Sequence, residues 1–77
     1  MKTVHFYTKP GCHLCELALE VVERVRVVVP FSLELIDITG ERELEERYRY
    51  DIPVVLLDGR EVFRHHVYEE DLVRLLD

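Results

Sequence analysis

Hydrophobic residues follow two different periods in the first third of the chain. The segment Thr3–Tyr7 is rich in β-branched and aromatic residues, which is typical of a β-strand. Pro10 and Gly11 break that strand, and apolar residues then recur at steps of three and four, as on one face of a helix. The residues of this predicted face are Leu14, Leu17, Ala18, Val21, Val22, Val25, Val28 and Val29. Pro30 ends the helical pattern, although Val27–Val29 is equally compatible with the start of a strand.

The middle of the chain predicts a second strand and a short charged helix. Leucines alternate with polar residues at the start of Ser32–Ile38, which predicts a strand that ends before Gly40. A strand, a helix and a second strand in succession form a right-handed parallel unit. In Glu41–Tyr48, the apolar anchors Leu44 and Tyr48 lie four residues apart, and the Glu and Arg residues between them are expected to face solvent.

A hairpin and a last helix complete the predicted order β-α-β-α-β-β-α. Asp58-Gly59 is a strong two-residue turn signal between the strands Val54–Leu57 and Arg60–Arg64. The segment Tyr68–Leu76 predicts a helix, because acidic residues fill its first turn. Its predicted apolar face consists of Tyr68, Leu72, Leu75 and Leu76.

Composition narrows the range of partners. At 77 residues, the chain is expected to form one domain spanning residues 1–77. Its net charge of −6 argues against a nucleic-acid or anionic-membrane surface, because few Lys and Arg are present to neutralise phosphates. No signal peptide and no bilayer-spanning apolar run is visible, so the expected location is the reducing cytoplasm. In that compartment, two neighbouring cysteines are more often catalytic than structural.

The only two cysteines, Cys12 and Cys15, fall at the predicted junction between the first strand and the first helix. The backbone N–H groups of a first helical turn lack partners, and the helix dipole is positive there, so a thiolate at Cys12 should be stabilised. Lys9 and a protonated His13 would add to this effect. Cys15 lies about one turn further along the helix, near enough to close a disulfide with Cys12. The outer sulfur then attacks a substrate, and the inner sulfur resolves the mixed disulfide.

Other uses of a C-x-x-C pair fit this sequence less well. A structural zinc site takes four ligands, and no second cysteine pair is present to supply them. His5, His65 and His66 are further candidate ligands, but the last two are adjacent and lack the usual spacing. Attachment of a c-type haem requires histidine directly after the second cysteine, where Glu16 stands. A structural disulfide would close too short a loop to restrain the unfolded chain strongly.

The order of elements, with C-x-x-C at the first strand-to-helix junction, resembles the thioredoxin superfamily. Residues 6–15, FYTKPGCHLC, look closest to glutaredoxins and small glutaredoxin-like proteins. The later run Ile52-Pro53-Val54-Val55 matches the place where these families carry a cis-proline. The resemblance covers essentially the whole chain. It implies an α/β, thioredoxin-like fold, with a four-stranded mixed sheet and helices on both faces.

The resemblance also implies roles for individual residues. Cys12 would be the attacking thiol and Cys15 the resolving thiol. Pro53 would face the cysteines, with the backbone of Ile52 available to pair with an extended substrate. Lys9 matches a basic residue that holds a glutathione carboxylate in many glutaredoxins. No bound cofactor is implied; the substrates would be disulfide-containing proteins or small-thiol disulfides, and glutathione, another thiol or a reductase would recycle the protein.

Two departures from the glutaredoxin pattern concern glutathione. His13-Leu14 stands between the cysteines, where glutaredoxins usually have Pro-Tyr. The segment Phe63–His66 stands where glutaredoxins have a Gly-Gly pair whose backbone approaches glutathione closely. Side chains in that segment are expected to obstruct this approach, although Arg64 offers a charge for a carboxylate. We therefore expect glutathione to bind weakly.

Three functions remain open on the sequence alone. The first is a dithiol–disulfide oxidoreductase that uses Cys12 and Cys15. The second is a binding protein whose two thiolates hold zinc, copper(I) or a shared iron–sulfur cluster. The third is an interaction domain whose cysteines are redox-inert. The metal content of the purified protein, with and without a thiol blocker, separates the first two.

Overall fold

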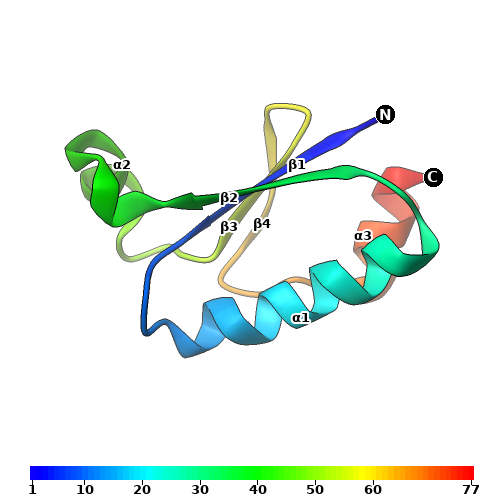
Figure 1. The fold of residues 1–77 in the computed structure, drawn as a ribbon, viewed down its shortest axis with the longest axis horizontal. Coiled ribbons are helices and arrows are strands. Elements are labelled where there is room, and N and C mark those ends of the chain that lie inside the picture. Colours follow the sequence, from blue (N-terminus) through cyan, green and yellow to red (C-terminus); the bar gives the residue numbers. More distant parts are fainter.

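A computed structural model describes residues 1–77 and contains one mixed β-sheet (Figure 1). The strands are β1 (Thr3–Thr8), β2 (Ser32–Asp37), β3 (Val54–Leu57) and β4 (Arg60–Arg64). Their order in the sheet is β2-β1-β3-β4, with β1 and β2 parallel and the other pairs antiparallel. The predicted four-stranded mixed sheet is confirmed, and β1 lies in its interior.

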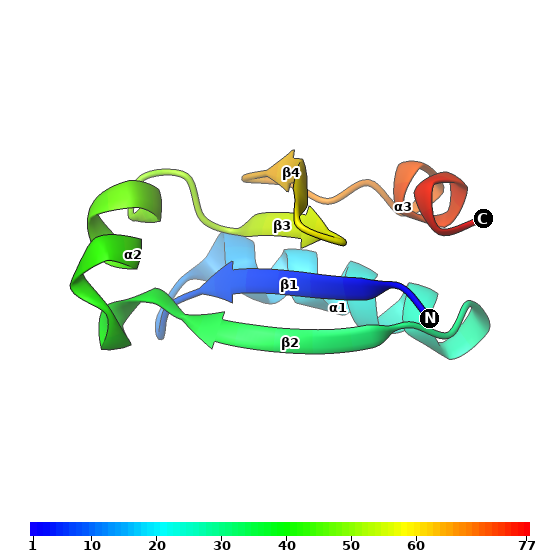
Figure 2. The same ribbon diagram turned by 90° about the horizontal axis from the view of Figure 1, so that it is seen from above.

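Three α-helices surround this sheet. They are α1 (His13–Val28), α2 (Arg42–Tyr48) and α3 (Glu69–Leu76), and a 3₁₀ turn at Ile38–Gly40 precedes α2. Helices α1 and α3 lie on one side of the sheet, while α2 lies at the end of the sheet and toward the other side (Figure 1). Seen from above, both chain termini lie at the end of the molecule opposite the start of α1 (Figure 2). No helix combines the length and apolarity that crossing a bilayer requires.

Helix α1 begins and ends where the sequence predicts. Cys12 is its N-cap, with an extended backbone, and its sulfur accepts a hydrogen bond from the N–H of Cys15. The helix continues through Val28, so Val27–Val29 does not begin a strand. Pro30 follows directly after the C-cap, as expected of a residue that cannot continue a helix.

The core lies between the sheet and α1. Val4 and Phe6 of β1 are fully buried, and they meet a seam of α1 residues that recur at steps of three and four. The buried seam residues of α1 are Cys15, Ala18, Val22 and Val25. The wider apolar face predicted for α1 was wrong in part, because Leu14, Leu17 and Val28 are exposed. A helix on a sheet buries one narrow stripe, and the apolar residues beside that stripe stay accessible.

Helix α3 also buries less than predicted. Leu72 is fully buried, but Leu75 is 40% exposed. Tyr68 is the N-cap rather than a helical residue, and its side chain is 60% exposed. Of the predicted apolar face, Leu72 is fully buried and Leu76, one turn further along, is partly buried against the core.

Helix α2 is attached to the second face of the sheet through aromatic stacking. Tyr48 is buried, and its ring centroid lies 4.8 Å from that of Tyr7, while Leu44 packs against the core as predicted. Burial, with the neighbouring Tyr48 hydroxyl, raises the pKa of Tyr7. Tyr7 therefore stays neutral at physiological pH and contributes packing surface rather than charge.

The hairpin between β3 and β4 turns at Asp58-Gly59, as predicted. Both residues have positive φ, +49° and +85°, which is the backbone of a type I′ turn. The carboxylate of Asp58 accepts a hydrogen bond of 2.9 Å from the N–H of Thr3, which ties the turn to the start of β1. The hairpin thereby holds β3 in register and sets the position of the residues that precede it.

Candidate functional site

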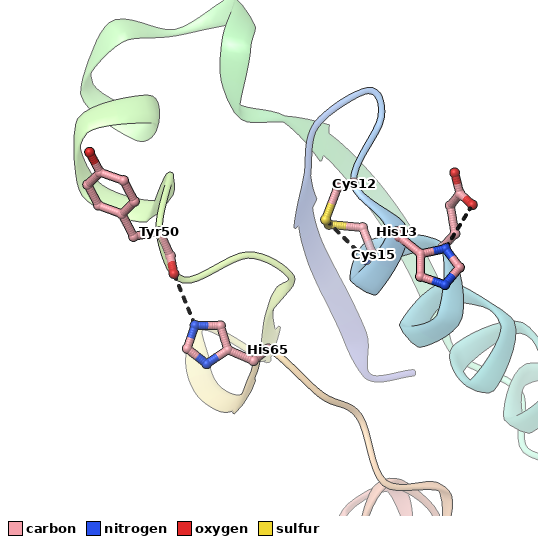
Figure 3. Close-up of a disulfide and its surroundings, with 6 residues drawn as sticks. Cys12, His13, Cys15, Tyr50 and His65 are labelled. Atoms are coloured by element: carbon pink, nitrogen blue, oxygen red, sulfur yellow. Dashed lines mark hydrogen bonds and ion pairs between the residues drawn. A yellow bond between two sulfur atoms is a disulfide. The ribbon is translucent and has the colours of Figure 1, made fainter.

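The two cysteines are joined by a disulfide at the start of α1 (Figure 3). Their Cα atoms lie 5.2 Å apart. Cys12 remains partly accessible at the helix N-cap, whereas Cys15 is only 3% exposed and belongs to the core. A sulfur on an approaching substrate can therefore reach Cys12 but not Cys15.

The backbone around Cys12 is suited to a negative sulfur. The N–H of Cys15 points at the Cys12 sulfur over 3.1 Å, and the other N–H groups of the first turn face the same end of the helix. These groups and the helix dipole would stabilise a thiolate on Cys12 after reduction. The geometry therefore supports the assignment of Cys12 as the attacking sulfur and Cys15 as the resolving sulfur.

The Ile52–Pro53 peptide bond is cis, as predicted. Val54 pairs with Tyr7 near the end of β1, so Pro53 lies at the same end of the strands as the segment that leads to Cys12. The N–H of Ile52 donates to the carbonyl of Tyr48 at 3.1 Å. The expectation that the Ile52 backbone is free to pair with a substrate is therefore half wrong: its N–H is occupied, and only its carbonyl accepts no backbone hydrogen bond.

Lys9 and His13 lie differently with respect to the disulfide. Lys9 lines a hollow of about 210 Å³ together with Cys12, Cys15 and Leu19, and it makes no ion pair. The His13 ring is 79% exposed and points away from the disulfide toward Glu16, 3.8 Å away (Figure 3). Lys9 is thus placed to contribute positive charge at the site, and His13 is not.

Arg64 is occupied by two carboxylates of its own chain. Its guanidinium makes two hydrogen bonds of 3.1 Å to Glu61 and lies 3.6 Å from Asp51. The hydrogen bonds to Glu61, with the charge of Asp51, raise the pKa of Arg64. The candidate role of Arg64 in holding a substrate carboxylate would require it to leave these partners.

The segment Phe63–His66, which stands where glutaredoxins have a glycine pair, forms a turn that hydrogen bonds hold in place. His65 has φ +70°, a conformation that glycine adopts more easily than other residues. Its backbone N–H donates to the Pro53 carbonyl at 2.8 Å, and its ring nitrogen lies 3.0 Å from the Tyr50 carbonyl (Figure 3). The sequence gives no sign of the contact between His65 and Tyr50, because the two residues are brought together only by the fold.

The obstruction expected from Phe63–His66 takes a different form in the structure. Phe63 is 7% exposed and belongs to the core, so it does not stand over the cysteines. The His65 ring turns toward Tyr50, away from the disulfide (Figure 3). What this segment lacks is a free glycine backbone for close approach, because the His65 N–H is already bonded.

No group of three or more His, Cys, Asp or Glu side chains is arranged to hold a metal ion. His5 instead pairs with Glu34 across neighbouring strands at 3.0 Å, as expected of a packed or edge histidine. His65 faces Tyr50 and Asp51 rather than the cysteines (Figure 3). In this structure, none of these histidines is grouped with the two cysteines as a set of candidate metal ligands.

Comparison with known proteins agrees with the fold and the cysteine pair. The family model described as Glutaredoxin-like domain (DUF836) matches residues 3–77, which is nearly the whole chain. The chain belongs to the glutaredoxin-like family. Among curated relatives, it is 33% identical over 75 residues to the glutaredoxin-like protein YDR286C homolog of Dictyostelium discoideum. That match covers 90% of this chain and 69% of the relative.

Solved structures show the same fold at low sequence identity. The protein Ne2328 of Nitrosomonas europaea superposes with a TM-score of 0.84 at 24% identity, covering 99% of this chain and 92% of the other. A mutant thioredoxin of Halobacterium salinarum gives a TM-score of 0.72 at 21% identity, covering 97% and 71% of the two chains. A thioredoxin fold that carries a C-x-x-C pair supports a redox-type role for this glutaredoxin-like protein.

The difference in exposure between the two sulfurs leads to a first prediction. After reduction, iodoacetamide should alkylate Cys12 at least about tenfold faster than Cys15, because Cys12 is partly accessible and its sulfur accepts a hydrogen bond from an N–H of the first helical turn. Peptide mapping by mass spectrometry after short labelling times measures both rates. In denaturant, the two cysteines should react at nearly equal rates. Faster labelling of Cys15 in the folded protein would reverse the assigned roles.

Proposed function

We propose that this glutaredoxin-like protein is a dithiol–disulfide oxidoreductase in which Cys12 attacks and Cys15 resolves. The observation that carries the proposal is the asymmetry of the pair: an accessible sulfur at a helix N-cap is bonded to a buried one. The segment Ile52–Pro53 adds support, because it lies at the same end of the sheet as the segment that leads to Cys12, and the Ile52 carbonyl accepts no backbone hydrogen bond.

The proposed reaction has two exchange steps. The Cys12 thiolate attacks one sulfur of the substrate disulfide, forming a Cys12–substrate bond, and the other substrate sulfur leaves as a thiolate that takes up a proton. Cys15 then loses its proton and attacks the Cys12 sulfur, which closes the protein disulfide and releases the second substrate thiol. Two electrons pass from the protein to the substrate. An external dithiol, two molecules of a monothiol such as glutathione, or a reductase returns them.

Location and recycling follow from the same chemistry. A strained or exposed disulfide is reducible by cellular thiols, and the partly accessible Cys12 sulfur allows such attack. We propose a reducing compartment, the cytoplasm, as the place of action, since the pair must be reduced before it can reduce a substrate. The protein itself then needs no resident cofactor, and its partners are the disulfide substrate and the thiol that recycles it.

The most direct test is a redox titration of the Cys12–Cys15 pair. Equilibration with glutathione buffers of graded ratio, followed by alkylation of free thiols, should give a two-electron transition within the range of cellular thiol buffers. Metal analysis of protein purified with and without a thiol blocker gives the control for a metal-binding role. A pair that stays oxidised or reduced across all buffers, or a stoichiometric bound metal, would contradict the proposal.

The arrangement around the disulfide favours other substrates over glutathione, which gives a second prediction. We expect the protein to reduce insulin disulfides, with dithiothreitol as electron donor, faster than it removes glutathione from a glutathionylated peptide. Arg64 is held by Glu61, and exposed Lys9 offers an ion pair typically worth only about 0–1 kcal/mol. The two rates are compared at equal enzyme concentration. Fast deglutathionylation that saturates at low substrate concentration would show that glutathione is bound well after all.

A further inference from the structure

A groove follows one flank of α1 and starts at Leu14, which is next to Cys15 in the sequence. Leu14 and Leu17 of α1 are 38% and 47% exposed, although they are large apolar residues. With Val21, they lie at helical steps of three and four along the same flank. Val67, from the segment between β4 and α3, lines the opposite wall, and a hollow of about 140 Å³ lies between the two walls.

The groove continues to the acidic first turn of α3. A second hollow of about 490 Å³ shares Val21, Val67 and Tyr68 with the first and ends at Glu69 and Glu70. Glu69 bonds to Arg24 of α1 at 2.9 Å, which places α1 and α3 side by side at this point (Figure 1). Glu70 makes no ion pair, and the lining of the far end has an excess of negative charge, with three acidic residues beside Arg24.

We infer that this groove binds the chain segment next to the reacting cysteine of a protein substrate. The segment carries an apolar side chain that packs on Leu17 and, further from the cysteine, a basic side chain that meets Glu70. The inference rests on the proposed oxidoreductase function, and it names the class of substrate for the same site. It adds two recognition elements that lie outside the Cys12–Cys15 pair.

The length of the helix sets the spacing of these two elements. Leu17 follows Cys12 by five positions, or about 7.5 Å along the axis, and Arg24 follows by twelve, or about 18 Å. An extended peptide advances about 3.3 Å per residue. The apolar residue is therefore expected about two positions from the reacting cysteine. The acidic end of the groove lies level with Arg24, because Arg24 is bonded to Glu69. The basic residue is therefore expected about five positions from the reacting cysteine.

The same lengths and charges select the occupant. A glutathione molecule of three residues spans at most about 10 Å, too short to reach from Cys12 to α3. A second copy of this chain carries a net charge of −6 and would be repelled by the acidic end of the groove. A longer peptide with an apolar and a basic residue matches both the length of the groove and the negative charge at its far end.

The test uses eight-residue peptides linked as disulfide homodimers. A reference peptide carries serine near its cysteine, and two further peptides carry Leu two positions and Lys five positions from it, either before or after the cysteine. The reduced protein should reduce one of these two about tenfold faster than the reference, because the leucine leaves water. Acid quenching and chromatography measure each initial rate.

Paired variants connect that advantage to the groove. In Leu17→Ser, the advantage of the leucine peptide should fall to about twofold or less, whereas Val27→Ser, at a residue 88% exposed near the far end of α1, should keep it. In Glu70→Lys, the advantage of the same peptide over the reference should fall about threefold. Glu43→Lys makes the same charge change on α2, away from the groove, and should keep the full advantage. Circular dichroism confirms that each variant is folded.

The outcomes separate this inference from the proposed function. If no peptide is reduced, the oxidoreductase function is wrong and the groove loses its role with it. If the reference peptide is reduced as fast as the others, or if Leu17→Ser keeps the full advantage, the oxidoreductase function stands and the groove inference is wrong. A dimer in gel filtration that Leu17→Ser dissociates would also overturn the inference, because the groove would then bind a second copy.

Discussion

Cys12→Ser should lower insulin disulfide reduction by at least about a thousandfold, because it removes the only accessible sulfur of the pair. Cys15→Ser should fail differently. Its Cys12 thiolate still attacks a substrate, but no neighbouring sulfur releases the product. A covalent protein–substrate disulfide should therefore accumulate in Cys15→Ser and be absent in Cys12→Ser. Mass spectrometry under non-reducing conditions detects this species.

The two variants control for each other. Each loses the same disulfide and gains the same serine hydroxyl, so a general effect of the lost cross-link would act on both alike. A covalent species of equal amount in both variants would contradict the division of roles. So would a Cys12→Ser protein that keeps more than a few per cent of the activity.

Phe6→Ala should have the largest effect on stability. Phe6 is fully buried at the centre of β1, between β2 and β3, and its removal leaves a cavity that the surrounding core fills only in part. Such a truncation lowers the free energy of unfolding by about 3–5 kcal/mol. A small domain has only about 5–15 kcal/mol in total. Urea unfolding followed by circular dichroism, with both proteins oxidised, measures the difference.

Val27→Ala is the matched control for this experiment. Val27 is 88% exposed near the end of α1, so its truncation should change the free energy of unfolding by no more than about 0.5 kcal/mol. A loss below about 1 kcal/mol in Phe6→Ala would mean that the centre of the sheet is packed less tightly than the structure shows.

Local signals in the sequence were enough to place most of the site. The β-branched run before Pro10, the change of period after it and the turn signal at Asp58-Gly59 each act over a few residues, and the structure confirms all three elements. Cys12 could be placed at the helix N-terminus because Pro10 and Gly11 break the strand just before it. The cis bond before Pro53 came from resemblance to a family, since the dipeptide alone carries only a low prior.

The parts that could not be predicted depend on contacts between distant segments. Arg64 is occupied by Glu61 and Asp51, and the Ile52 N–H by Tyr48; both partners are reached through the folding of the chain, not through a motif. Apolar periodicity also overestimates the buried face of a helix. It cannot tell Ala18, which meets the sheet, from Leu17, which lies at the edge of a groove.

The position of the chain termini makes this domain suitable for fusion to a reporter or for immobilisation on a surface. Both ends lie opposite the start of α1, so a linker at either end leaves the disulfide facing free solution (Figure 2). A fluorescent reporter, a resin or an electrode can therefore be joined to either end of the chain without covering Cys12. The reactive cysteine thus lies at one end of the domain, and both possible attachment sites lie at the other end.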